Sequence, residues 1–138
     1  MENLNGTESE NLLQSSLEDL HQVSKYWLDE IEFWKTELVF FQDLLDKFCP
    51  NIHTTEDKKQ LDHFQNLIIY YNGEVLDEYN RKIRKHTKML ARLMDEPLSF
   101  EDLSYRDQHK TYGDEMSSMG KRLQEIKTEL FEFIQTIW

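Results

Sequence analysis

Two prolines, Pro50 and Pro97, divide this 138-residue chain into three long stretches that carry apolar residues at helical spacing. Proline ends a helix because its ring clashes with the preceding turn and its nitrogen carries no hydrogen. The prolines therefore mark turns near residues 49–53 and 96–98. In the first stretch the repeat positions alternate spacings of four and three: Leu13, Leu17, Leu20, Ser24, Trp27, Ile31, Trp34, Leu38, Phe41, Leu45 and Phe48. The third stretch does the same: Tyr105, His109, Tyr112, Met116, Met119, Leu123, Ile126, Leu130, Phe133 and Ile137.

This heptad repeat is typical of helices that pack at shallow angles, and it predicts an all-α fold. We expect helices over about 8–48, 54–95 and 99–137, with Thr54 and Ser99 as N-caps. Short turns make consecutive helices antiparallel. The predicted structure is one domain over residues 1–138, an antiparallel bundle of three long helices with coiled-coil-like heptad packing. A disordered tail over residues 1–7 is expected to precede it.

Antiparallel pairing also predicts which residues face one another. Along two antiparallel helices one residue number rises as the other falls, so the numbers of two residues that face each other have a constant sum. We expect this sum to be about 103 for the first two helices and about 194 for the last two. This pairing places Gly73 and Gly120 beside Trp27, as small residues that accommodate a large one. The competing interpretation is a hinge in residues 113–120, and the sequence leaves open whether the helix kinks or breaks there.

The second stretch departs from the repeat in its middle. After Ile68, Tyr71 and Val75, two consecutive spacings of four lead through Tyr79 to Ile83. Such a stutter locally unwinds a coiled coil.

The formal net charge of −11 works against nucleic acid as a partner, because binding to phosphates relies on Lys and Arg. One stretch, however, contains six cations and no acid: Arg81, Lys82, Arg84, Lys85, Lys88 and Arg92. The helix pairing predicts exposed ion pairs between these cations and Glu10, Glu18 and Asp19 of the first helix. The alternative interpretation of the stretch is a phosphate or RNA patch.

No run approaches the roughly 20 apolar residues that span a bilayer, so we expect no transmembrane helix and no membrane partner. The first residues are acidic and polar, unlike the basic start of a signal peptide. The one cysteine, Cys49, has no internal disulfide partner, as is usual in a reducing compartment. We therefore expect a cytoplasmic protein.

No segment carries a catalytic motif. The four glycines stand alone, so a glycine-rich phosphate loop is absent. Cys49 and His53 form at most half of a zinc site, and no third group follows that would orient a Cys–His nucleophile. The sequence therefore predicts no enzyme and no cofactor.

The histidines give an alternative function. His86 and His109 occupy repeat positions at one level, and His21 lies about one turn away. Because imidazole is a common metal ligand, these three residues are the candidate metal site of a metal- or small-ligand-binding bundle. The competing interpretation is a polar pair that fixes helix register and hydrogen-bonds to tyrosine, and for that pair we expect the two rings to point apart.

The leading functional prediction rests on apolar residues that lie outside the repeat positions. They occur on all three helices, in the half that contains the first turn and the C-terminus: Tyr26, Phe33, Phe40, Leu44, Ile69, Tyr70, Phe131 and Trp138. A cluster of this kind is typical of an association surface, which predicts a homodimer or binding of a partner protein helix. A locally thicker core is the competing interpretation.

Three segments resemble those of small all-helical bacterial proteins of unknown function. These are residues 27–35 (WLDEIEFWK), residues 63–66 (HFQN) and the end of the chain from Phe131 to Trp138. The resemblance implies a bundle of long helices and supplies no activity or site.

Overall fold

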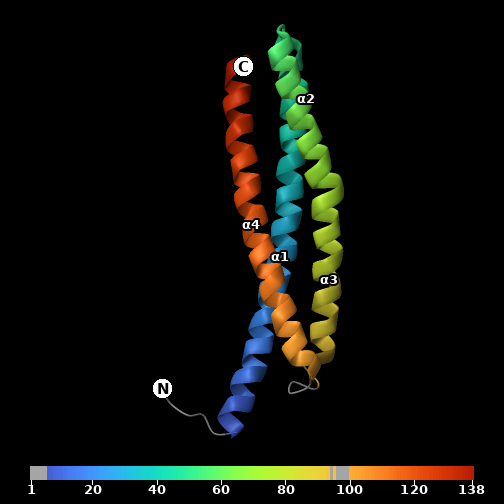
Figure 1. Ribbon diagram of the computed structural model, residues 1–138, viewed down its shortest axis with the longest axis vertical. Helices are drawn as coiled ribbons and strands as arrows, with labels where there is room; N and C mark the ends of the chain where they lie inside the picture. Colours follow the sequence, from blue (N-terminus) through green and yellow to red (C-terminus); the bar gives the residue numbers. More distant parts are fainter. Residues whose placement is uncertain (1–5, 94, 96–99) are drawn as a thin grey trace.

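The computed structural model describes the backbone of residues 6–93, 95 and 100–138, and the side chains of residues 17–93, 95 and 103–138. Within these residues the fold is all-α, as predicted, and contains no strand. The elements in chain order are α1 (Gly6–Phe48), the 3-10 turn η1 (Cys49–Asn51), α2 (Thr55–Tyr70), the π-helical turn η2 (Tyr71–Val75), α3 (Leu76–Leu93) and α4 (Phe100–Ile137). Because α2, η2 and α3 follow one another without a gap, the chain forms three long helical rods, and Figure 1 shows it rising, returning and rising again.

The first turn has the predicted cap. The Thr54 hydroxyl accepts a hydrogen bond from the Asp57 amide at 3.0 Å, which satisfies one of the free N–H groups at the start of α2. The side-chain amide of Asn51 donates to the Ile137 carbonyl at 2.7 Å and so ties this turn to the end of α4. The second expected turn and its cap, Ser99, lie outside the described residues.

The expected helix bounds differ slightly at the chain start. α1 already includes Gly6 and Thr7, so only residues 1–5 of the expected tail lie outside the described backbone. Differences of one or two residues are usual at helix ends. α4 runs unbroken from Phe100 to Ile137, so the helix does not break in residues 113–120.

The stutter in the second stretch corresponds to the π-helical turn η2. A π-helix hydrogen-bonds from residue i to i+5 and therefore holds one extra residue in a turn. As a result Leu76 is fully buried, while the expected Val75 is only partly buried. Phe64 and Ile68 before η2, and Ile83 after it, keep their buried positions.

Two apolar clusters form the core. The larger one includes Trp27, Ile31 and Leu130 and extends towards the first turn. The smaller one joins residues near the other end of the molecule: Leu17, Leu90, Leu93 and Tyr105. Most predicted repeat positions with described side chains are buried, including the polar residues Ser24, His86 and His109.

The glycines pack partly as predicted. A Cβ atom on Gly113 would lie 3.4 Å from the ring of Trp27, and one on Gly120 would lie 3.3 Å from the ring of Trp34. Small residues therefore do accommodate tryptophans, but Gly120 meets Trp34 rather than Trp27. The prediction for Gly73 was wrong, because nothing lies within 4 Å of its Cβ position in η2.

The helix pairing was right for one pair of rods and wrong for the other. Tyr79 contacts Glu115 and His86 contacts His109, in agreement with the expected level. Between the first two rods, however, Lys35 pairs with Asp77, whereas the sequence placed Asp77 beside Tyr26. The reason lies in the turn. η1 and residues 52–54 continue past the end of α1 at Phe48, so α2 begins beyond that end and each residue of α1 faces a later residue of the second rod than expected.

Candidate functional site

Aromatic side chains line one side of α1 and are exposed to solvent. Phe33 is 62% exposed and Phe40 is 56% exposed, and Tyr26 continues the line one heptad earlier. Each of the three is seven residues from the next, so they share one face of the helix. We call Tyr26, Phe33, Phe40 and the α4 residue Phe131 the aromatic face.

Phe131 belongs to this surface through the core residue Phe41. The Phe41 ring packs edge-on against Phe131 at 5.3 Å and against Phe40 at 5.9 Å, measured between ring centroids. Beside the aromatic face, the Lys127 ammonium of α4 lies 2.8 Å from the Glu37 carboxylate of α1. Both charges of this pair are largely covered, and together they are neutral.

The other four predicted association residues are placed differently. Leu44 is partly buried against the main core, and Trp138 stacks on Phe48 at 4.6 Å at the end of the molecule. Ile69 and Tyr70 are exposed on α2, and Tyr70 lines a groove between η2, α3 and α4. The structure thus brings Phe40 and Phe131 together through Phe41, and it puts Tyr70 in a different environment.

The two candidate metal histidines meet in the core. The Nε2 atom of His86 lies 3.1 Å from the Nδ1 atom of His109, which is the distance of a hydrogen bond between two neutral imidazoles. The expectation that the rings point apart was therefore wrong. His86 stacks on Tyr105 at 4.0 Å, and His109 stacks on Trp27 at 4.5 Å, so the pair lies between the two apolar clusters.

The surroundings keep this pair uncharged. Burial, with a smaller contribution from the nearby His109, lowers the pKa of His86 to about 4. Burial also lowers the pKa of His109, with a smaller effect in the same direction from Arg106. Both imidazoles are therefore neutral near pH 7, and one donates while the other accepts.

The third candidate ligand, His21, is partly buried, and its Nδ1 atom has no hydrogen-bond partner among the described residues. Within the same residues no group of three or more His, Cys, Asp or Glu side chains is placed to hold a metal ion. Catalytic zinc sites use three protein ligands, so the His86–His109 pair alone falls short of that set.

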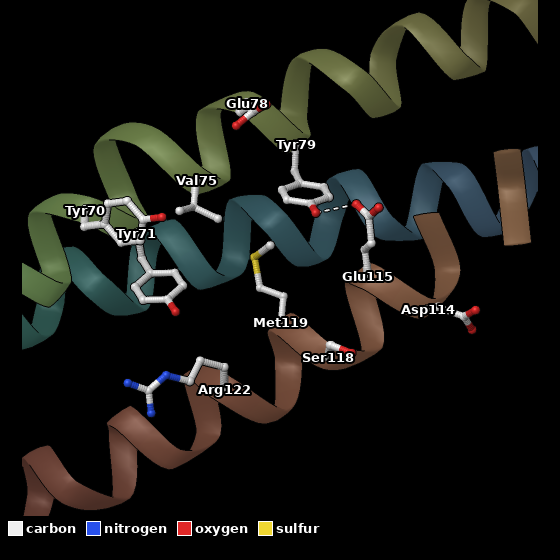
Figure 2. Close-up of a pocket in the computed structure, with 10 residues that line it drawn as sticks. All are labelled: Tyr70, Tyr71, Val75, Glu78, Tyr79, Asp114, Glu115, Ser118, Met119 and Arg122. Carbon is white, nitrogen blue, oxygen red and sulfur yellow. Dashed lines mark hydrogen bonds between the residues drawn. The ribbon is translucent and has the colours of Figure 1, made fainter. Parts of the chain in front are cut away.

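A groove of about 520 Å³ lies where η2 faces α4 (Figure 2). The Tyr79 hydroxyl donates a hydrogen bond to the Glu115 carboxylate across the groove. Arg122 lines the same groove, and the nearby Tyr71 raises the pKa of its guanidinium. Sequence reasoning missed this site, although the expected pairing of the last two helices puts Tyr79 level with Glu115.

The chemistry of this groove is that of hydrogen bonding. Burial and the hydrogen bond to Glu115 raise the pKa of Tyr79 well above its ordinary value, so the hydroxyl stays protonated near neutral pH. A group in this state donates hydrogen bonds and does not act as a general base.

The chain matches no protein family, no curated protein and no solved structure. In the part of the chain that the structure describes, no helix has the length and apolar content needed to cross a membrane.

Proposed function

We propose that the chain is a structural or protein-interaction module, an antiparallel three-helix bundle with heptad packing that forms a two-fold homodimer through the aromatic face. The supporting observation is the exposure of Phe33 and Phe40 on one line of α1, next to Phe131 of α4. Large exposed aromatic side chains in a contiguous patch are the usual mark of an association surface.

A second copy of the chain is the simplest occupant of this face, because a two-fold interface needs only one surface that is complementary to itself. The neutral Glu37–Lys127 pair at its border removes one source of repulsion between two acidic copies. A stable interface buries at least about 1,000 Å² in total. Helices about 60 Å long offer enough surface to bury that area. The alternative partner for such a face is a helix of a different protein.

The test is to replace Phe33 and Phe40 together by Glu. The two charges would lie in the middle of the proposed interface, so association should be lost. Helicity should survive because both side chains point away from the core. The matched control is Met89→Glu with Leu103→Glu, which adds the same charge at exposed apolar positions outside the aromatic face and should leave the dimer intact. A Phe33→Glu/Phe40→Glu protein that unfolds would instead assign both side chains to the core.

The second candidate function is metal or small-ligand binding at the histidine layer, and the contact between His86 and His109 favours it. Native mass spectrometry of the untagged protein with added zinc measures bound metal and oligomeric state together. One zinc ion per chain that disappears in His86→Gln would establish this function, and the absence of bound zinc would exclude zinc.

We propose no catalytic activity for the chain and a cytoplasmic location. The absence of a catalytic motif supports the first, and the acidic composition with one unpaired cysteine fits the second.

A further inference from the structure

A second groove, of about 430 Å³, lies between α3 and the first part of α4. Four cations of α3 line it: Lys82, Lys85, Lys88 and Arg92. Met89, Gln108 and Tyr112 complete its walls, and the buried His86 lies at its base. Among the described residues that line it there is no carboxylate, although the whole chain has a formal net charge of −11.

Three of these cations have no acidic partner in the part of the chain that the structure describes. The ion pairs that the sequence predicts with Glu18 and Asp19 do not form, because the actual pairing of the first two rods is shifted, and the side chain of Glu10 lies outside the described residues. Arg84 donates instead to Asn80 at 2.7 Å, and Lys82 pairs with Glu78 at 3.2 Å within the helix. No carboxylate among the described residues lies within ion-pair distance of Lys85, Lys88 or Arg92.

The overall negative charge does not cancel this local field. At physiological ionic strength, charges more than about 8 Å apart are largely screened from one another. The cations that line the groove therefore decide what enters it, and the acids elsewhere on the surface have little effect there. A groove with walls of low dielectric also strengthens the attraction between its cations and an anion.

Size and charge together indicate the class of anion. The volume of about 430 Å³ lies within the range of about 300–1,000 Å³ that is usual for small-molecule sites. From Lys82 to Arg92 the cations extend over about 15 Å of helix, which is more than one phosphate reaches. Lys and Arg are the side chains that most often bind phosphate, and Gln108 and Tyr112 add neutral donors from α4.

We propose that this groove binds a small ligand that carries a chain of two or more phosphates. The phosphates lie along Lys85, Lys88 and Arg92, and Met89 with Tyr112 gives an apolar surface for any organic part of the ligand. Inorganic tripolyphosphate and a nucleoside triphosphate share this chemistry, and they differ only in whether that apolar surface is used.

Isothermal titration calorimetry with tripolyphosphate, ATP and orthophosphate tests the proposal on the full chain. We expect tripolyphosphate to bind with one site per chain, more tightly than orthophosphate, and to weaken as salt is raised. Lys85→Gln with Arg92→Gln should weaken its binding about tenfold, since hydrogen bonds to charged groups are lost. The matched control, Arg81→Gln with Lys121→Gln, removes the same charge from exposed positions that do not line the groove.

NMR locates the ligand independently. The ring resonances of His86 should shift during the tripolyphosphate titration, whereas those of His53, which is exposed in the first turn, should not. Equal affinities for ATP and tripolyphosphate would show that the phosphate chain alone is bound, and a higher affinity for ATP would show that the apolar surface contributes.

Three results would overturn the proposal. The first is no binding of either phosphate chain. The second is an equal loss of affinity in both double variants, which would mean diffuse attraction without a site. The third is tighter binding of a short oligouridylate than of tripolyphosphate, which would replace the small ligand by single-stranded nucleic acid.

Discussion

At the scale of single residues, the histidine pair shows what a periodic pattern predicts and what it leaves open. The spacing placed His86 and His109 on the inner faces of two helices at one level, and the structure confirms this. Spacing gives the face and level of a side chain but not its χ angles. The meeting of the two rings, and their stacking on Tyr105 and Trp27, therefore could not be predicted.

The buried pair makes stability depend on pH. The folded state holds the pKa of His86 near 4, while in the unfolded chain it is near 6.5, so between these values the unfolded state binds more protons. The free energy of unfolding should therefore fall by about 1–3 kcal/mol as the pH is lowered from 6.5 to 4. Urea denaturation at a series of pH values measures this.

His86→Gln isolates the contribution of His86, because the amide still offers His109 a hydrogen-bond partner but does not titrate. The fall in stability towards pH 4 should be smaller in this variant, while His53→Gln should behave like the wild type. An unchanged pH dependence in His86→Gln would show that other groups cause the effect.

Substitutions at two glycines should have opposite effects on the free energy of unfolding. Gly73 has open space around its Cβ position, so Gly73→Ala should raise the free energy of unfolding by about 0.5–1 kcal/mol through better helix propensity. Gly120 lies against the ring of Trp34, so Gly120→Val should lower it by about 1–3 kcal/mol. Chemical denaturation compares the two, and a stabilising Gly120→Val would contradict the packing described for Trp34.

At the scale of helices, the sequence indicated that the winding changes near η2, but it did not specify that the change takes the form of a π-helical turn. Two consecutive spacings of four signalled a local change in winding, and the structure accommodates it with one extra residue in a turn. This choice keeps Leu76 and Ile83 buried on either side of Tyr79. A gradual unwinding over several turns fits the same sequence pattern, so the pattern alone did not decide between them.

Deleting Gly73 should convert η2 into an ordinary α-helical turn and leave the core register on both sides unchanged. Deleting Arg81 instead rotates the rest of α3 by about 100° and turns Ile83 and Leu90 away from the core. We expect circular dichroism and thermal melting to show a cooperative fold for the first deletion and severe destabilisation for the second. Equal damage from both deletions would mean that η2 is required in its own right.

At the scale of the whole molecule, the all-α class and the three long helical rods were predictable because the repeat persists over many turns. The level of the first rod against the second was not, because it depends on how far the chain runs through η1 and residues 52–54 before it reverses. With that shift the expected ion pairs of the basic stretch with Glu18 and Asp19 do not form, and Lys85, Lys88 and Arg92 line a groove. The aromatic face was predicted in part, since Phe33 and Phe40 are exposed as expected.

Self-association through the aromatic face is the central claim, and sedimentation equilibrium of the untagged wild-type protein over a wide concentration range tests it most directly. The chain has a mass of 16.8 kDa. We predict a reversible approach to twice that mass as concentration rises, with no larger species, because a two-fold interface closes on itself. A single species of 16.8 kDa at the highest concentration would contradict the homodimer.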